Sequence, residues 1–116
     1  MFFSLIKDAS NLSMYGHIPE ITRATEDEAE TYRGDFEDGL LLCDYLLPEM
    51  DKRIKDCLVD IGDLDYFDKD RCVILREILK EKLEAPPTPR LQELYTILDG
   101  YVKRAIELDT GVVLEF

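Results

Sequence analysis

The chain has 116 residues, of which 26 are acidic and 14 are basic, and its formal net charge is −12 at pH 7. This length fits one domain, 1–116, that can bury a core without a metal or a disulfide, and a hydrophobic content of 46% argues against a disordered chain. The acidic excess makes nucleic acid and anionic membranes poor partners, because phosphate binding needs clustered Lys and Arg, and it favours a basic protein partner.

The N-terminal third carries the weakest structural signals. The run FFSLI at 2–6 fits either a short buried strand or one turn of helix. Residues 25–38 contain seven acids and one Arg. We expect Thr25 to cap a short helix there, with acids in its positive first turn, and Gly34 to end it.

The segment 39–61 gives the first strong helical signal. Its apolar residues follow one another at alternating steps of three and four, from Leu40 to Ile61, which is the spacing of one helix face. Asp38 is expected to cap this helix. Pro48 has no backbone N–H, so it predicts either one kinked helix or two helices, the second beginning at Pro48.

Two further helices are predicted over 69–83 and 89–108, where the same spacing recurs. Asp68 and Thr88 precede them, and both residue types cap helices well. After Gly111 the tail VVLEF is β-prone and predicts a short terminal strand that could lie beside FFSLI. The sequence therefore predicts a mainly α fold, a small bundle of three to four helices, with at most a short terminal strand pair.

Charge is distributed unevenly along this chain. Residues 1–70 contain 18 acids and 7 bases, whereas residues 71–116 contain 8 acids and 7 bases. The acids concentrate in 26–38 and 60–70, where they surround Tyr and Phe residues, as in interfaces with aromatic anchors and steering charges. We predict a partner-binding surface formed by Glu26, Asp27, Glu28, Glu30, Asp35, Glu37, Asp60, Asp63, Asp65, Tyr66, Phe67 and Asp68. The alternative is an ordinary solvated acidic surface with the aromatic residues in the core.

Motifs of catalysis and cofactor binding are missing from the sequence. Cys43, Cys57 and Cys72 form no CxxC pair, and the lone His17 is expected to be a structural or surface residue. The aspartates of 60–70 depart from a calcium-binding loop at its fifth and sixth positions. We expect no enzymatic activity, no cofactor and no metal. Because no apolar run is long enough for a signal sequence or a membrane span, we expect a cytoplasmic protein.

The ending AIELDTGVVLEF, in which a helix passes through Thr110 and Gly111 into a strand, resembles that of some bacterial immunity proteins. These proteins belong to contact-dependent growth inhibition and related polymorphic toxin systems, in particular those that protect against ribonuclease toxins. The resemblance implies an inhibitor that blocks the active site of a cognate toxin through an acidic surface. Three alternatives remain: a nucleic-acid mimic, a helical adaptor or oligomer subunit, and a small enzyme with an acid pair.

Overall fold

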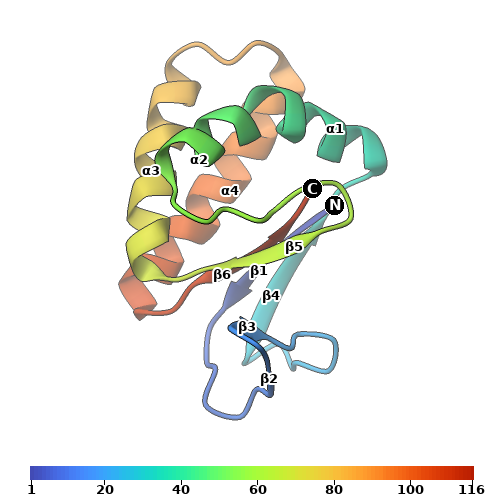
Figure 1. Ribbon diagram of the computed structural model, residues 1–116, viewed down its shortest axis with the longest axis vertical. Coiled ribbons are helices and arrows are strands. Elements are labelled where there is room, and N and C mark those ends of the chain that lie inside the picture. The colour runs from blue at the N-terminus through green and yellow to red at the C-terminus, as the bar shows by residue number, and fades with distance from the viewer.

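A four-stranded antiparallel sheet with helices on one face makes up the protein (Figure 1). The structure is a computed structural model that describes residues 1–116. Its sheet contains β1 (Phe2–Ile6), β4 (Ala29–Arg33), β5 (Leu64–Phe67) and β6 (Val112–Glu115). The helices are α1 (Phe36–Tyr45), α2 (Leu47–Arg53), α3 (Lys69–Glu84) and α4 (Pro89–Leu108), and a separate hairpin is formed by β2 (Met14–Tyr15) and β3 (Ile18–Pro19).

The prediction of a mainly α fold is wrong, because a four-stranded antiparallel sheet forms one layer of the protein and the helices pack on it, so the fold is α/β. Its strand order is β4–β1–β6–β5, with every pair antiparallel. The expected pairing of FFSLI with VVLEF is confirmed, and it forms the centre of the sheet. The two outer strands were not predicted, since each acquires its partner only from a distant part of the chain.

The acid-rich segment 25–38 contains a strand instead of the expected helix. Thr25 does not cap a helix; its backbone N–H and hydroxyl both donate to the Glu28 carboxylate in a tight turn. Beyond that turn, Thr31 hydrogen-bonds Ser4 of β1 at 2.8 Å, and Tyr32 stacks on Phe3 with ring centroids 5.8 Å apart. Such cross-strand pairs stabilise a sheet, and they outweigh the helix-favouring acids.

The expected helix over 39–61 is two shorter helices followed by a turn and an irregular loop. Asp35, not Asp38, is the N-cap of α1, and Asp38 completes a capping box with it. The chain breaks at Leu46, and Pro48 lies in the first turn of α2, which confirms the two-helix alternative. The helical spacing of 54–61 was misleading, because α2 ends at Arg53.

Side chains of Asp65 and Arg71 hold the irregular segment after α2 in place. Asp56 adopts a left-handed conformation with φ of 57°, and its carbonyl accepts a hydrogen bond from Arg71 of α3 at 3.3 Å. The backbone N–H of Leu58 donates to the Asp65 carboxylate at 3.0 Å. These bonds replace the helical ones and lead the chain into β5, a strand that was not predicted.

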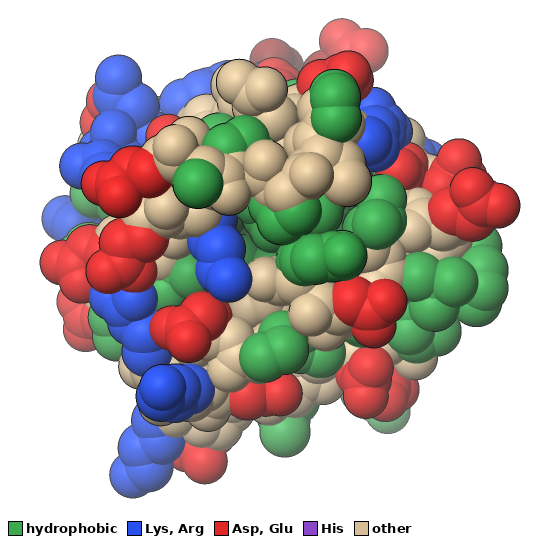
Figure 2. All heavy atoms as spheres, turned by 90° about the horizontal axis from the view of Figure 1, so that it is seen from above, with side chains coloured by type: hydrophobic (Ala, Val, Ile, Leu, Met, Phe, Trp, Pro, Cys, Tyr) green, Lys and Arg blue, Asp and Glu red, His purple; other side chains and the backbone are tan.

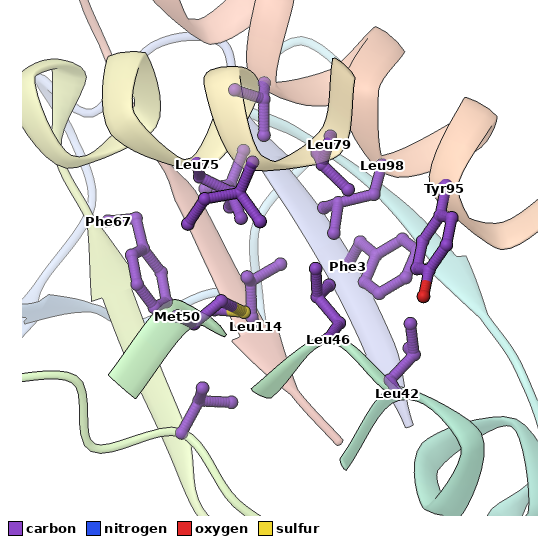
Figure 3. Packing of buried hydrophobic residues seen from close by; sticks show 14 of the residues in the cluster. Phe3, Leu42, Leu46, Met50, Phe67, Leu75, Leu79, Tyr95, Leu98 and Leu114 are labelled. Carbon is purple, nitrogen blue, oxygen red and sulfur yellow. The ribbon is translucent and has the colours of Figure 1, made fainter. Parts of the chain in front are cut away.

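Helices α3 and α4 confirm their predictions in position and capping. The side chains of Asp68 and Thr88 accept hydrogen bonds from the backbone of Arg71 and Leu91, respectively. Both helices lie over the sheet, and their apolar faces form the core together with side chains from the strands and from α1 and α2 (Figure 3). None of the four helices has a stretch long and apolar enough to cross a bilayer.

Candidate protein-binding surface

The two acid-rich segments lie at opposite edges of the sheet. Residues 26–33 lead into and form the edge strand β4, whereas residues 60–67 lead into and form the other edge strand, β5. Strands β1 and β6 lie between them, so the edges are about 14 Å apart at a spacing of about 4.8 Å per strand. The predicted acids therefore do not form one patch.

The chain's own bases neutralise part of the β4 edge. The Glu30 carboxylate accepts a hydrogen bond from Arg104 at 2.9 Å, which holds its pKa below the usual range, and it lies 3.9 Å from Lys7. Lys7 also donates to the carbonyl of Glu26. Although Glu26 and Asp27 are exposed, this edge offers a partner less uncompensated negative charge than its sequence suggests.

Two predicted contact residues of β5, Asp65 and Phe67, are fully buried. The Asp65 carboxylate accepts hydrogen bonds from His17 at 2.9 Å, from Arg71 at 3.0 Å and from the backbone N–H of Leu58 at 3.0 Å. Burial raises the pKa of Asp65, but these hydrogen bonds more than offset it and leave the pKa lowered. Asp65 is thus an internal clamp between distant segments.

The aromatic residues of the 60–70 segment do not form an exposed pair of anchors. Phe67 belongs to the core, and the Arg71 guanidinium lies 4.3 Å from the centre of its ring. Tyr66 is half-buried, with burial raising the pKa of its hydroxyl. The neighbouring residue Asp68 is exposed and caps α3. It follows the last residue of β5, whereas Asp60 and Asp63 precede the first.

Exposed acids and exposed hydrophobic side chains gather on α1 and the neighbouring loop 56–64. The loop contacts the helix where the Cys43 thiol donates to Asp60 at 3.8 Å. Gly39 of α1 lies against the Phe116 carbonyl, directly beyond the pairing of Leu64 with Glu115. We call this region the α1–loop surface; its exposed members are Phe36, Glu37, Leu40, Asp44, Asp56, Leu58, Asp60, Ile61, Asp63 and Leu64.

The α1–loop surface has no positive charge of its own. Residues 35–51 and 56–68 contain no Lys or Arg. Figure 2 shows acidic and hydrophobic side chains on the side of α1, whereas most of the visible Lys and Arg side chains lie on the opposite side, together with further acids. On this face the basic side chains, not the acidic ones, are therefore distributed unevenly.

Several carboxylates near this surface have internal roles. Asp35 caps α1, and the buried Asp38 accepts two hydrogen bonds from Arg90, at 2.7 and 2.9 Å. These bonds lower the pKa of Asp38. Glu37, Asp60 and Asp63 remain exposed, and they are the predicted residues that belong to the α1–loop surface.

Sequence reasoning missed the hydrophobic part of the surface. Leu40 and Ile61 were assigned to one face of a single long helix, yet both are exposed, and Ile61 lies in a loop because α2 ends at Arg53. Leu58, which lies in the same predicted helix, is 62% exposed. The turn at Asp56, where φ is positive, takes the chain out of its helical course, and no sequence pattern reveals this turn.

The structure offers little for cofactor or covalent chemistry at this surface. Burial raises the pKa of Cys57 to about 11 and that of Cys72 to about 12, so both thiols stay protonated at neutral pH. No group of three or more His, Cys, Asp or Glu side chains is placed to hold a metal ion. His17 is a surface residue with a structural contact, as expected.

No protein-family model matches the sequence, and no curated protein or solved structure is significantly similar to it. Function is therefore inferred from the geometry and charge of the molecule.

Proposed function

We propose that this protein is an immunity protein that binds a cognate nuclease toxin and blocks its active site without doing chemistry. The α1–loop surface carries this proposal, because it combines exposed carboxylates with exposed hydrophobic side chains and the segments that form it contain no Lys or Arg. An inhibitor of a basic protein needs both features, since charge guides the encounter and apolar contacts hold the complex.

Electrostatics supplies the mode of inhibition. A ribonuclease active site must present cationic groups to hold phosphate. The carboxylates of Asp44, Asp60 and Asp63 can occupy the place of phosphates in such a site and exclude RNA. Opposite charges also raise association rates by one to three orders of magnitude at low salt, which favours capture of a toxin that has just entered the cell.

The hydrophobic side chains favour a protein interface over a merely solvated acidic face. Phe36, Leu40 and Leu58 are each more than 40% exposed and lie among the acids. Apolar surface removed from water contributes about 25 cal/mol per Å². Burying these side chains against a partner would therefore provide affinity that exposed charges alone do not.

The direct test is co-expression with a nuclease toxin domain encoded by the neighbouring gene. We expect growth to be rescued, a stable complex to form and the purified nuclease to lose activity. A toxin domain that stays fully active at saturating concentrations of this protein would contradict the proposal.

A charge variant tests the surface itself. The triple variant Asp44→Asn, Asp60→Asn and Asp63→Asn should slow association with the toxin domain at least tenfold at low salt and flatten the salt dependence of the rate. The matched control at the β4 edge, Glu26→Gln with Asp27→Asn, should change the rate less than threefold. Equal effects of the two variants would contradict the assignment to the α1–loop surface.

A further inference from the structure

The β2–β3 hairpin exposes large hydrophobic side chains, although it is too short to be stable without support from the rest of the protein. Its strands have two residues each, and Gly16 between them adopts φ of 63°. A two-stranded hairpin is marginal in water even when much longer. Yet Tyr15 is 81% exposed, the highest value among the large hydrophobic residues, and Met14 is 54% exposed.

A single buried carboxylate ties this hairpin to the loop of the α1–loop surface. One oxygen of Asp65 accepts the hydrogen bond from His17 in the hairpin, and the other accepts the bond from the backbone of Leu58. Pro19 is buried beside the sheet and fixes the second strand of the hairpin. The hairpin tip and the exposed Leu58 are thus neighbours held by the same group.

The segments on both sides of this junction lack basic residues. Residues 8–22, which include the hairpin, contain no Lys or Arg, and the same is true of residues 56–68. The cation at the junction, Arg71, is only 20% exposed and is paired with Asp65, so a cationic protein surface can approach both segments with little repulsion. Tyr side chains are enriched among the strongest contacts of interfaces, and an exposed Tyr ring attracts Lys and Arg through its π face.

We propose that the β2–β3 hairpin is a second contact element for the basic partner. Tyr15 is its anchor, and His17 is a positioning residue that acts through Asp65. This inference rests on the proposed function. It predicts that the interface extends from the α1–loop surface past Leu58 to the hairpin tip.

Binding of an active-site-inactivated toxin domain from the neighbouring gene tests the anchor. Tyr15→Ala should raise the Kd for this toxin domain at least tenfold. Because Tyr15 is exposed, the same substitution should leave the thermal unfolding midpoint of the free protein unchanged. Leu108→Ala and Val73→Ala are matched controls, since these exposed hydrophobic residues lie on α4 and α3. Both controls should bind like the wild type.

The positioning role of His17 needs a measurement that does not depend on the partner. In the free protein, His17→Ala should increase the hydrogen-exchange rates of the hairpin amides at least tenfold and leave those of α3 unchanged. The same variant should weaken toxin binding, and its combination with Tyr15→Ala should bind no worse than Tyr15→Ala alone. Unchanged hairpin exchange, or fully additive losses of binding, would overturn the role of His17.

The two proposals fail in different ways. A wild-type protein that does not bind the toxin domain overturns the proposed function and this inference with it. Tight binding by the wild type, with equally tight binding by Tyr15→Ala and Leu108→Ala, overturns the hairpin proposal alone.

Discussion

Arg71→Ala is expected to be one of the most destabilising single substitutions in this protein. It removes the cation that lies 3.0 Å from the fully buried Asp65 carboxylate. Removing one partner of a buried ion pair costs about 3–5 kcal/mol, because the remaining charge is left without compensation. The substitution also removes hydrogen bonds to the carbonyls of Tyr66 and Asp56 and the contact with the Phe67 ring.

The magnitude should fall near the lower end of that range. The Arg71 side chain is 20% exposed, so water can reach the vacated space, and His17 still donates to Asp65. We expect a loss of about 3 kcal/mol in the free energy of unfolding. For a domain of this size this corresponds to a fall of roughly 12 °C in Tm, at about 4 °C per kcal/mol.

Urea denaturation at pH 7, followed by circular dichroism, measures this loss. The control variant is Arg33→Ala. Arg33 is exposed and contacts the Phe2 ring but has no ion pair within 4.0 Å, so we expect a loss of less than about 0.5 kcal/mol in the free energy of unfolding. In a double-mutant cycle, Asp65→Asn should relieve part of the cost of Arg71→Ala by removing the uncompensated charge. A loss below 1 kcal/mol for Arg71→Ala, or strictly additive effects, would refute the clamp.

Two more predictions concern stability. Asp38 and Asp65 have folded-state pKa values below the ordinary aspartate value of 3.8. The stabilisation that these carboxylates provide is therefore complete well above that value and is lost as pH falls through the lowered values. The urea midpoint should consequently stay flat between pH 7 and about 5 and fall steeply below about pH 4. Asp38→Asn should make this fall shallower. The same steep fall in the variant as in the wild type would contradict the role of Asp38. Gly111→Ala would place a Cβ against the Phe67 carbonyl and the Tyr66 ring, so it should cost at least about 2 kcal/mol in thermal unfolding; a wild-type Tm would contradict this close approach.

Local signals made α3 and α4 predictable from the sequence. Each has a long apolar stripe, a capping residue at its start and a break beyond its end, and all three signals agree. The pairing of β1 with β6 was predictable from two short β-prone runs. Strands β4 and β5 were not, because their residues gain from pairing with distant strands and not from any local pattern.

The candidate surface was predictable only in part, for the same reason. Glu37, Asp60 and Asp63 were found from charge alone. Recognition of LDYF as a strand would have placed Asp65 and Phe67 on one face and Leu64 and Tyr66 on the other. That alternation is the signal that separates the buried clamp from the exposed residues.

The pairing at the middle of the sheet has a consequence for folding kinetics. Ser4 lies opposite Val113, so the central ladder joins residues more than a hundred positions apart. Closing so long a loop makes folding slower than in a helical bundle of equal size. Substitutions of exposed side chains on α1 and at the hairpin tip should therefore leave the folding rate nearly unchanged, because these residues take no part in the central ladder.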